Sequence, residues 1–191
     1  SGKSGIGIMK KPFFIVFLLS ILLSSCNFFT PAEKNTPIIC LTFDDQKDGV
    51  YTYAFPLMQE YGYRGTCYVN SRYLYGPKIM SLAQIRELHN DYNWEIGGHS
   101  LCHEDLAELT YEEAEYTISQ DYWNLYNWGF NPRSFAMPSG KCPLEYYPIL
   151  TRYYTYLRGC NDYAMHIPLN VQGLGYLAFQ SSWTADIYKE R

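Results

Sequence analysis

The sequence predicts an α/β fold in which helices cover a parallel β-sheet. Two observations support this prediction. Short apolar runs alternate with helix-like segments from Ile38 to Leu157, and polar residues follow two of the apolar runs directly. Because the carboxyl ends of parallel strands lie along one rim of an α/β fold, these polar residues are expected to converge. No internal repeat or low-complexity tract appears in the chain.

The predicted strands are short apolar runs at residues 38–41, 65–69, 94–98, 134–137 and 154–157. The predicted helices lie between them, at residues 50–61, 81–90, about 111–128 and 144–151. In the second helix Leu82, Ile85 and Leu88 share one face, which is typical of an amphipathic helix. The third helix opens with the capping box Thr110-Tyr111-Glu112-Glu113. Repeated βα units of this kind predict a parallel sheet with helices outside.

Two carboxylates and two imidazoles follow the first and third predicted strands. The carboxylates are Asp44 and Asp45, and the imidazoles are those of His99 and His103. Neutral imidazole nitrogens and one carboxylate can hold a zinc-like ion and leave a position open for water, while the second carboxylate acts as a base. Taken alone, an Asp-Asp pair is typical of a turn or helix N-cap, and a His-x-x-x-His pair of a protein surface. Their order, each at a strand exit, favours a hydrolytic metal site.

Several segments together resemble the polysaccharide deacetylase family, also called the NodB-homology or carbohydrate esterase 4 group. The resemblance extends from about Ile38 to about Gly159. The matching segments are Leu41-Thr42-Phe43-Asp44-Asp45, Gly62-Tyr63-Arg64-Gly65-Thr66-Cys67-Tyr68-Val69, Glu95-Ile96-Gly97-Gly98-His99-Ser100-Leu101-Cys102-His103-Glu104-Asp105-Leu106 and Ser134-Phe135-Ala136-Met137-Pro138-Ser139-Gly140.

The resemblance implies a distorted (β/α) barrel and a metal-dependent hydrolase that removes acetyl groups from N-acetylated sugars of a polysaccharide. It also implies roles for individual residues: Asp45, His99 and His103 as metal ligands, Asp44 as the general base, and Pro138, Ser139 and Gly140 in substrate binding. The expected ion is Zn²⁺, and Co²⁺ or Ni²⁺ would also suit this set of ligands. Peptidoglycan, chitin-like chains, poly-N-acetylglucosamine and acetylated xylan all stay open as substrates.

Two departures from the family pattern bear on activity. Many relatives carry an arginine that orients the catalytic aspartate at the position of Ala136, and the form found here resembles the branch that trims poly-N-acetylglucosamine. The late histidine that protonates the leaving amine is not found; we interpret His166 as a structural or surface residue. We therefore expect a barrel that is incomplete at its C-terminus, either because the chain is a fragment or because its late elements have diverged. The alternatives to a deacetylase are a glycan-binding pseudoenzyme and an O-acetyl esterase using the same site.

The N-terminal region predicts a lipoprotein. Residues 1–8 are interpreted as upstream or vector sequence, and residues 9–25 as a signal peptide with a basic start, an apolar run and Leu23-Ser24-Ser25 before Cys26. Cys26 would be lipidated and would anchor the protein to the membrane of a bacterial cell envelope, facing outside the cytoplasm. Residues 26–37 would form a tether, and residues 38–191 the deacetylase domain.

The charge and aromatic content of the chain limit the classes of partner that it can bind. The chain has 15 basic and 19 acidic residues, and removal of residues 1–25 leaves 12 basic residues, for a net charge of −7. Such a surface would repel nucleic acid. Among 20 tyrosines, most are expected in the core, and Tyr51, Tyr53, Tyr73 and Tyr75 are candidates for stacking on sugar rings because they lie near predicted strand exits. The oligomeric state is left open.

Overall fold

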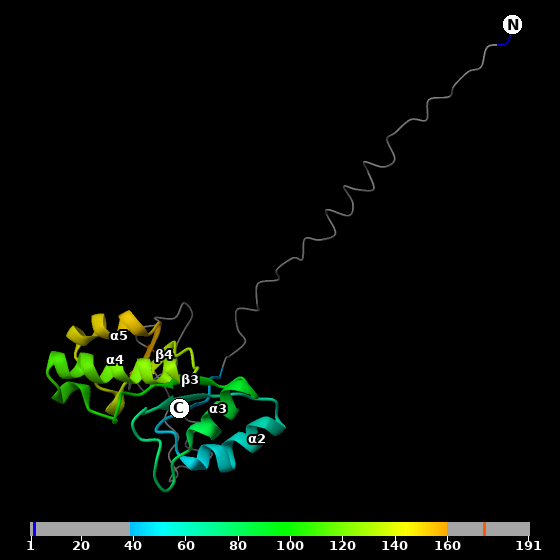
Figure 1. Cartoon of the computed structure of the whole chain (residues 1–191), viewed down its shortest axis with the longest axis horizontal. Helices are drawn as coiled ribbons and strands as arrows, with labels where there is room; N and C mark the ends of the chain where they lie inside the picture. The colour runs from blue at the N-terminus through cyan, green and yellow to red at the C-terminus, as the bar shows by residue number, and fades with distance from the viewer. Residues whose placement is uncertain (1, 3–38, 160–173, 175–191) are drawn as a thin grey trace, which may run out of the picture. The chain divides into compact units, whose positions relative to one another are not determined.

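The structure is a computed structural model that describes residue 2, residues 39–159 and residue 174 (Figure 1). The chain divides into two units, Ser1–Ile39 and Cys40–Arg191, and all elements below belong to the second. The predicted signal peptide, Cys26, the tether and His166 lie outside the described residues, so the interpretations of these parts stay predictions. Among the described residues, no helix is both long and apolar enough to cross a membrane.

The sheet is parallel and its five strands follow one another in chain order. The strands are β1 (Thr42–Phe43), β2 (Thr66–Val69), β3 (Glu95–Gly98), β4 (Ser134–Ala136) and β5 (Tyr156–Arg158). Leu174 pairs with Arg158 in a parallel bridge, so the sheet continues on the far side of β5. The predicted α/β class and parallel sheet are therefore confirmed.

Helices connect the strands, as Figure 1 shows for α2 to α5. They are the π-helix η1 (Val50–Ala54), α2 (Phe55–Glu60), α3 (Leu82–Asn90), the 3-10 turns η2 (Leu106–Glu108), η3 (Pro138–Gly140) and η4 (Leu144–Tyr146), α4 (Tyr111–Asn127) and α5 (Tyr147–Tyr153). The predicted capping box of α4 is present: Glu113 N–H donates to Thr110 Oγ1, and Thr110 N–H donates to Glu113 Oε2. Ser81 and Gln84 form a second box at α3.

Three boundaries differ from the prediction. The first strand begins at Thr42 instead of residue 38, because its partner β2 begins at Thr66, directly opposite. The last strand covers Tyr156–Arg158 instead of 154–157, because Tyr154 caps α5 and donates its backbone N–H to Leu150. The helix predicted from Val50 starts as a π-helix. Pro56 lies in the first turn of α2 and has no N–H to donate, which favours a local change of helix type.

Two apolar clusters hold the helices on the sheet. The first joins α2 and α3 to β2 and β3, and includes Phe55, Met58, Ile85, Leu88, Trp94 and Ile96. The second joins α4 and α5 to β4 and β5, and includes Ile118, Phe135, Ile149, Leu150 and Leu157. These side chains are at most 8% exposed. Because burial of apolar surface is the main favourable contribution to folding, the clusters fix where the strand ends lie.

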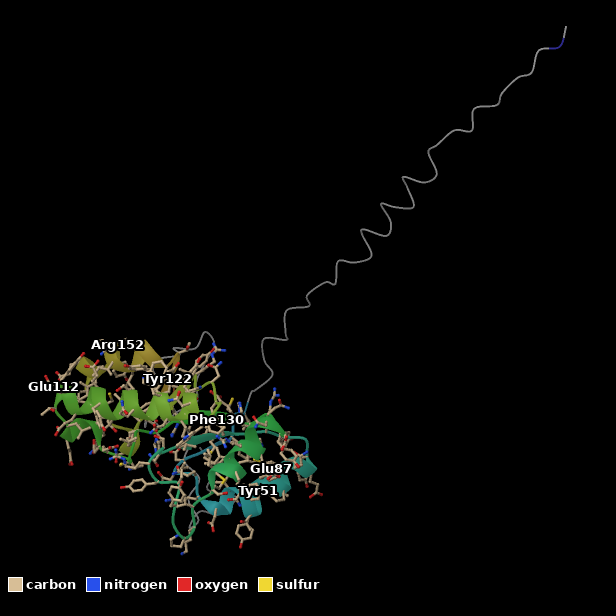
Figure 2. The ribbon with its side chains drawn as sticks, viewed as in Figure 1. Tyr51, Glu87, Glu112, Tyr122, Phe130 and Arg152 are labelled. Atoms are coloured by element: carbon tan, nitrogen blue, oxygen red, sulfur yellow. The ribbon has the colours of Figure 1, made fainter. Side chains whose placement is uncertain are left out.

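Tyr51 connects η1 to α3 near the first cluster. Its hydroxyl donates to Glu87 Oε2 at 2.6 Å. Both residues are labelled in Figure 2. Its ring lies 5.6 Å from that of Phe55, and the bond to the carboxylate raises the pKa of the Tyr51 hydroxyl. Tyr51 is thus engaged in packing, contrary to the expectation that it would be available to a sugar ring.

Candidate metal centre and catalytic aspartate

Three predicted metal ligands converge at the carboxyl end of the sheet. Asp45 follows β1, and His99 and His103 follow β3. Asp45 Oδ1 lies 3.7 Å from His99 Nε2 and 3.6 Å from His103 Nε2, and the donor atoms of the three residues all lie within 4.8 Å of one another. Ligand atoms about 2.0–2.2 Å from a tetrahedral zinc ion lie about 3.3–3.6 Å apart. The two carboxylate–imidazole spacings are close to this range, and together with the donor chemistry they suit a zinc-like ion.

His99 is held in the orientation that a metal ligand requires. Its side chain is 2% exposed, and its Nδ1 lies 2.7 Å from the carbonyl oxygen of Ala136. Because a carbonyl only accepts, Nδ1 carries the proton and the Nε2 lone pair faces Asp45. Burial lowers the pKa of His99, while Asp44, the Ala136 carbonyl and Asp45 act against this shift. The net result favours the neutral imidazole, which is the form that binds metals.

His103 is presented by a tight loop after β3. Ser100 and His103 both have left-handed backbones, with φ of 64° and 60°. Glu104 holds the loop: it accepts from Ser100 Oγ at 2.7 Å and from the backbone N–H of Cys102 at 2.8 Å. Burial acts to raise the pKa of Glu104, but these hydrogen bonds prevail and bring it below its ordinary value. The loop therefore positions the imidazole of His103 through a charged side chain that is not itself one of the three donors.

Arg158 binds the predicted general base. Its Nη2 lies 2.7 Å from Asp44 Oδ1 and 2.6 Å from Oδ2. The arginine side chain is 7% exposed and that of Asp44 is 39% exposed, so the aspartate stays open to solvent while its partner is buried. The guanidinium also lies 5.0 Å from the centre of the Tyr68 ring, a distance typical of a cation–π contact. Asp44 is thus fixed next to Asp45 by an arginine from the last described strand.

Arg158 lies beside Ala136, on the neighbouring strand. Ala136 of β4 and Arg158 of β5 are Cα partners in the sheet, and directly paired residues project on the same face. Leu157 turns toward α5 in the apolar cluster, so alternation along β5 directs Arg158 to the opposite face. Arg158 is not among the site residues predicted from the sequence. The signal available was a single basic residue at the end of a predicted apolar strand.

A buried amide pair connects the strand exits beneath the metal centre. Gln46 is 0% exposed; its Nε2 donates to the carbonyls of Asn70 and Tyr73 at 3.2 and 2.8 Å, and its Oε1 accepts from Asn70 N–H at 2.9 Å. The side chain of Asn70 in turn donates to the carbonyl of His99. The exits of β1, β2 and β3 are therefore joined through two side chains that the sequence analysis also missed.

A hollow of about 350 Å³ opens beside the metal ligands. Its lining includes Asp45, His103, Lys47, Tyr73 and Tyr75. This volume falls within the range of about 300–1,000 Å³ typical of small-ligand sites. The two tyrosine side chains are 50% and 92% exposed, and they come from the loop that Gln46 binds. Tyr73 and Tyr75 are the tyrosines among the described residues that line the hollow.

The other predicted binding residues lie elsewhere on the rim. Tyr53, on η1, is 77% exposed but does not line the hollow. Pro138, Ser139 and Gly140 form η3 directly after β4. Ser139 has a left-handed backbone with φ of 53°. They are at the correct end of the sheet but not among the residues that line the hollow, so their role in substrate binding stays a prediction.

A buried carboxyl group lies behind His99. Asp121 of α4 is 0% exposed, and burial raises its pKa to about 8 although backbone and side-chain hydrogen bonds act in the opposite direction. Its Oδ2 lies 2.8 Å from where a Cβ on Gly98 would stand. Gly97 is likewise required by the Tyr68 ring, 2.7 Å from its virtual Cβ. Both glycines of β3 therefore make room for neighbouring side chains.

Comparison with known proteins gives one consistent family. A family model described as polysaccharide deacetylase matches residues 32–153. The chain is similar to a solved Streptococcus pyogenes deacetylase, PplD in complex with acetate, at a TM-score of 0.74 and 18% identity over 90% of this chain and 76% of that one. It is similar to the Bacillus cereus polysaccharide deacetylase BC0361 at a TM-score of 0.69 and 17% identity, over 80% of this chain and 50% of that one.

A third similar structure is a de-N-acetylase from Aggregatibacter actinomycetemcomitans, with a TM-score of 0.68 and 15% identity over 79% of this chain and 73% of that one. The chain thus spans about half the length of BC0361 and about three quarters of the other two. No curated protein sequence gives a significant match. At such identities these likenesses bear on the fold, and they confirm that the parallel sheet with its helices corresponds to part of a NodB-type (β/α) barrel.

Proposed function

Because this chain belongs to the polysaccharide deacetylase family, we propose that it is a metal-dependent hydrolase that removes acetyl groups from N-acetylated sugars of a polysaccharide. The observation that carries the proposal is the convergence of the donor atoms of Asp45, His99 and His103 within 4.8 Å. Asp44, next in the chain, is held by Arg158. This pairing of a metal-ligand set with a separate, partly exposed carboxylate is what hydrolysis of an amide requires.

The residues of the site have separate roles in the reaction. A divalent ion held by Asp45, His99 and His103 would supply Lewis acidity to the acyl oxygen and to the attacking water. Asp44 takes the proton from that water on a carboxylate oxygen, and Arg158 fixes the orientation of that carboxylate. The Ala136 carbonyl keeps the imidazole of His99 in the ligand tautomer. When the C–N bond breaks, the proton held by Asp44 passes to the leaving nitrogen, so the products are acetate and the free amine of the sugar.

The hollow beside the site supports a saccharide substrate. Tyr73 and Tyr75 present exposed rings next to Asp45 and His103, and aromatic rings offer large apolar faces with a polar edge, which suits the C–H faces and hydroxyl groups of a pyranose. We propose that these two tyrosines contact the sugar next to the one that is deacetylated. Tyr53 and Tyr51 are not proposed for this role.

The function is tested by metal content and acetate release together. The purified chain should hold about one divalent ion. Asp45→Ala and His103→Ala should lose it, whereas Asp44→Asn should keep it and lose acetate release. His89→Ala serves as the control, because His89 bonds the Trp94 carbonyl at the end of α3 and is not one of the three donors. A folded wild-type chain that binds no divalent metal would contradict the proposal.

Substrate panels then separate the related activities. Release of acetate from N-acetylglucosamine oligomers supports the deacetylase. Release from acetylated xylan alone would instead make the protein an O-acetyl esterase, and glycan binding without any acetate release would make it a pseudoenzyme.

We also propose that the protein is a lipoprotein anchored through Cys26 at the bacterial cell envelope. The support is the sequence Leu23-Ser24-Ser25-Cys26 after an apolar run. Labelling of expressing cells with a radioactive or alkyne-bearing fatty acid should mark the wild-type chain and not Cys26→Ala. Equal labelling of both would contradict the anchor.

A further inference from the structure

Helix α4 carries a stripe of polar side chains on the face that meets the sheet. The stripe consists of Thr117, Asp121 and Asn124, which are spaced by four and three residues and therefore share one side of the helix. Thr117 is 3% exposed and Asp121 is 0% exposed. A helix face that packs on a sheet is ordinarily apolar, and a buried polar group destabilises the fold unless it is hydrogen-bonded. The stripe therefore needs an explanation in terms of its partners.

Apart from the hydroxyl of Tyr154, the side-chain hydrogen bonds of the stripe described here go to the loops after β2 and β3. Thr117 Oγ1 accepts from the backbone N–H of Leu101 at 3.1 Å. Asp121 accepts from two strand exits: from Ser71 N–H on Oδ1 at 3.0 Å and from His99 N–H on Oδ2 at 3.2 Å. Asn124 Nδ2 donates to Ser71 Oγ at 3.1 Å. One helix thus binds the loop after β2 and the loop after β3 at the same time.

The sheet is shaped to admit the central carboxyl group, that of Asp121. The virtual Cβ of Gly98 lies 2.8 Å from Asp121 Oδ2 and also meets the hydroxyl of Tyr154. That hydroxyl donates to Oδ2 at 3.5 Å, and the Tyr154 ring packs on Tyr122, the neighbour of Asp121 labelled in Figure 2. An ordinary residue at position 98 would displace the carboxylate from His99 N–H.

We propose that the polar stripe of α4 positions His99 as a metal ligand, with Asp121 as the positioning residue on which metal affinity depends. Asp121 Oδ2 shares the His99 backbone N–H, at 3.2 Å, with the Val69 carbonyl at 3.1 Å, while Asn70 binds the His99 carbonyl and the Ala136 carbonyl lies 2.7 Å from Nδ1. Asp121 is the one of these contacts that ties the exit of β3 to α4, and its loss lets the main chain shift and turns Nε2 away from Asp45. Loss of a residue that orients a metal ligand typically weakens metal affinity about 10–100-fold. The inference rests on the proposed function only in that Asp45, His99 and His103 hold an ion.

The test compares Zn²⁺ affinities of whole-chain variants by competition with a chromogenic chelator. Asp121→Asn keeps the size of the side chain but places an NH₂ group against one of two backbone N–H groups, and it should weaken Zn²⁺ binding about 10–100-fold. Thr117→Val is the milder second variant, since it removes one hydrogen bond from the His99–His103 loop. It should weaken binding about 3–10-fold. With Co²⁺ bound, the visible absorption of Asp121→Asn should differ from that of the wild type.

The matched control is Ile118→Ala. Ile118 lies on the same helix, is 0% exposed and belongs to the apolar cluster instead of the stripe. Its truncation should lower the unfolding temperature of the metal-free chain, because it leaves a cavity in the apolar cluster. Zn²⁺ affinity should stay within about twofold of the wild type, because the packing of Ile118 does not orient the metal ligands.

Three results would overturn the inference. Wild-type Zn²⁺ affinity and Co²⁺ absorption in Asp121→Asn would show that the carboxylate does not orient His99; if that variant does not fold, wild-type affinity in Thr117→Val has the same meaning. Equal losses in Asp121→Asn and Ile118→Ala would reduce the effect to general destabilisation. A wild-type chain that binds no metal would overturn the proposed function as well, whereas the first two results leave that function standing.

Discussion

Replacement of Arg158 offers the sharpest test of the catalytic arrangement. Arg158 Nη2 lies 2.7 and 2.6 Å from the two carboxylate oxygens of Asp44, and hydrogen bonds to charged groups contribute about 1.5–3 kcal/mol each. If this contact orients the base in the transition state, Arg158→Met should lower kcat about 10–100-fold, which corresponds to about 1.4–2.7 kcal/mol. KM should change little, because the arginine is not among the residues that line the hollow.

The expected effect on stability is smaller than for a fully buried ion pair. Removal of one partner of a buried pair destabilises by about 3–5 kcal/mol, chiefly because a buried charge is left alone. Here the remaining charge belongs to Asp44, whose side chain is 39% exposed, so water can solvate it. We expect a loss of about 1–2 kcal/mol in the free energy of unfolding. The variant should therefore fold, and the change in kcat can be measured.

The assay is steady-state acetate release from an N-acetylglucosamine oligomer, with Zn²⁺ affinity measured alongside. Arg133→Met is the matched control, since Arg133 also lies over a tyrosine ring, 5.4 Å from the centre of Tyr156, but at the amino end of β5. It should keep the wild-type kcat. Wild-type kcat in a folded, metal-binding Arg158→Met would refute the reasoning. An exchange variant, Arg158→Ala with Ala136→Arg, should recover part of the lost kcat because the two positions are paired on one face.

Four further outcomes are expected. Tyr73→Ala and Tyr75→Ala should each raise KM for oligomers about 3–10-fold, the effect of losing about 0.5–1.5 kcal/mol of ring contact. Hydrolysis of a small aryl acetate should stay unchanged. Tyr53→Ala is the control, and an equal rise in its KM would contradict the proposed sugar contact. Thr110→Ala should destabilise by about 1 kcal/mol at pH 7 in thermal melts. Hydrogen bonds from Thr110 lower the pKa of Glu113 from 4.5. The stability that Glu113 contributes is therefore fully present above pH 4.5 and is lost as the pH falls through the lowered pKa. If the difference in unfolding free energy between wild type and Glu113→Gln persists at still lower pH, this reasoning is wrong. A chelator should abolish acetate release, and Zn²⁺ should restore it.

The elements with strong local signals could be predicted from the sequence. The capping box at Thr110 marks the start of α4 because its hydrogen bonds join residues three apart. The ligands Asp45, His99 and His103 could be anticipated because each follows an apolar run at the same rim of a parallel sheet. In these cases the structure depends on hydrogen bonds between residues close in the chain or on the direction of the strands. Both can be predicted from short stretches of sequence.

The rest depended on pairings over long distances in the chain. Arg158 reaches Asp44 across 114 positions, and its direction depends on the register of β5 against β4. A shift of that strand by one residue would turn the guanidinium to the helix side. Tyr51 was expected at a strand exit, but Glu87 of α3, 36 positions away, engages its hydroxyl. Gln46 and Asp121 look like ordinary surface residues in the sequence, since their partners are backbone groups that only the folded loops bring near.

The metal centre is built on backbone that is costly to fold, which explains why the side chains beneath it are polar. Seven non-glycine residues of the described chain have positive φ, and five of them flank the site: Asp45, Gln46, Ser100, His103 and Ser139. A left-handed conformation costs a non-glycine residue about 1–2 kcal/mol, so the five together oppose folding by about 5–10 kcal/mol, as much as the net stability of a typical domain. An apolar layer could not hold such loops, because their turned backbone leaves N–H and C=O groups that need partners. The buried side chains of Asn70 and Asp121 bind backbone groups in and beside these turns, at Ser71, His99 and Ser100, and this helps to fix the position of His99.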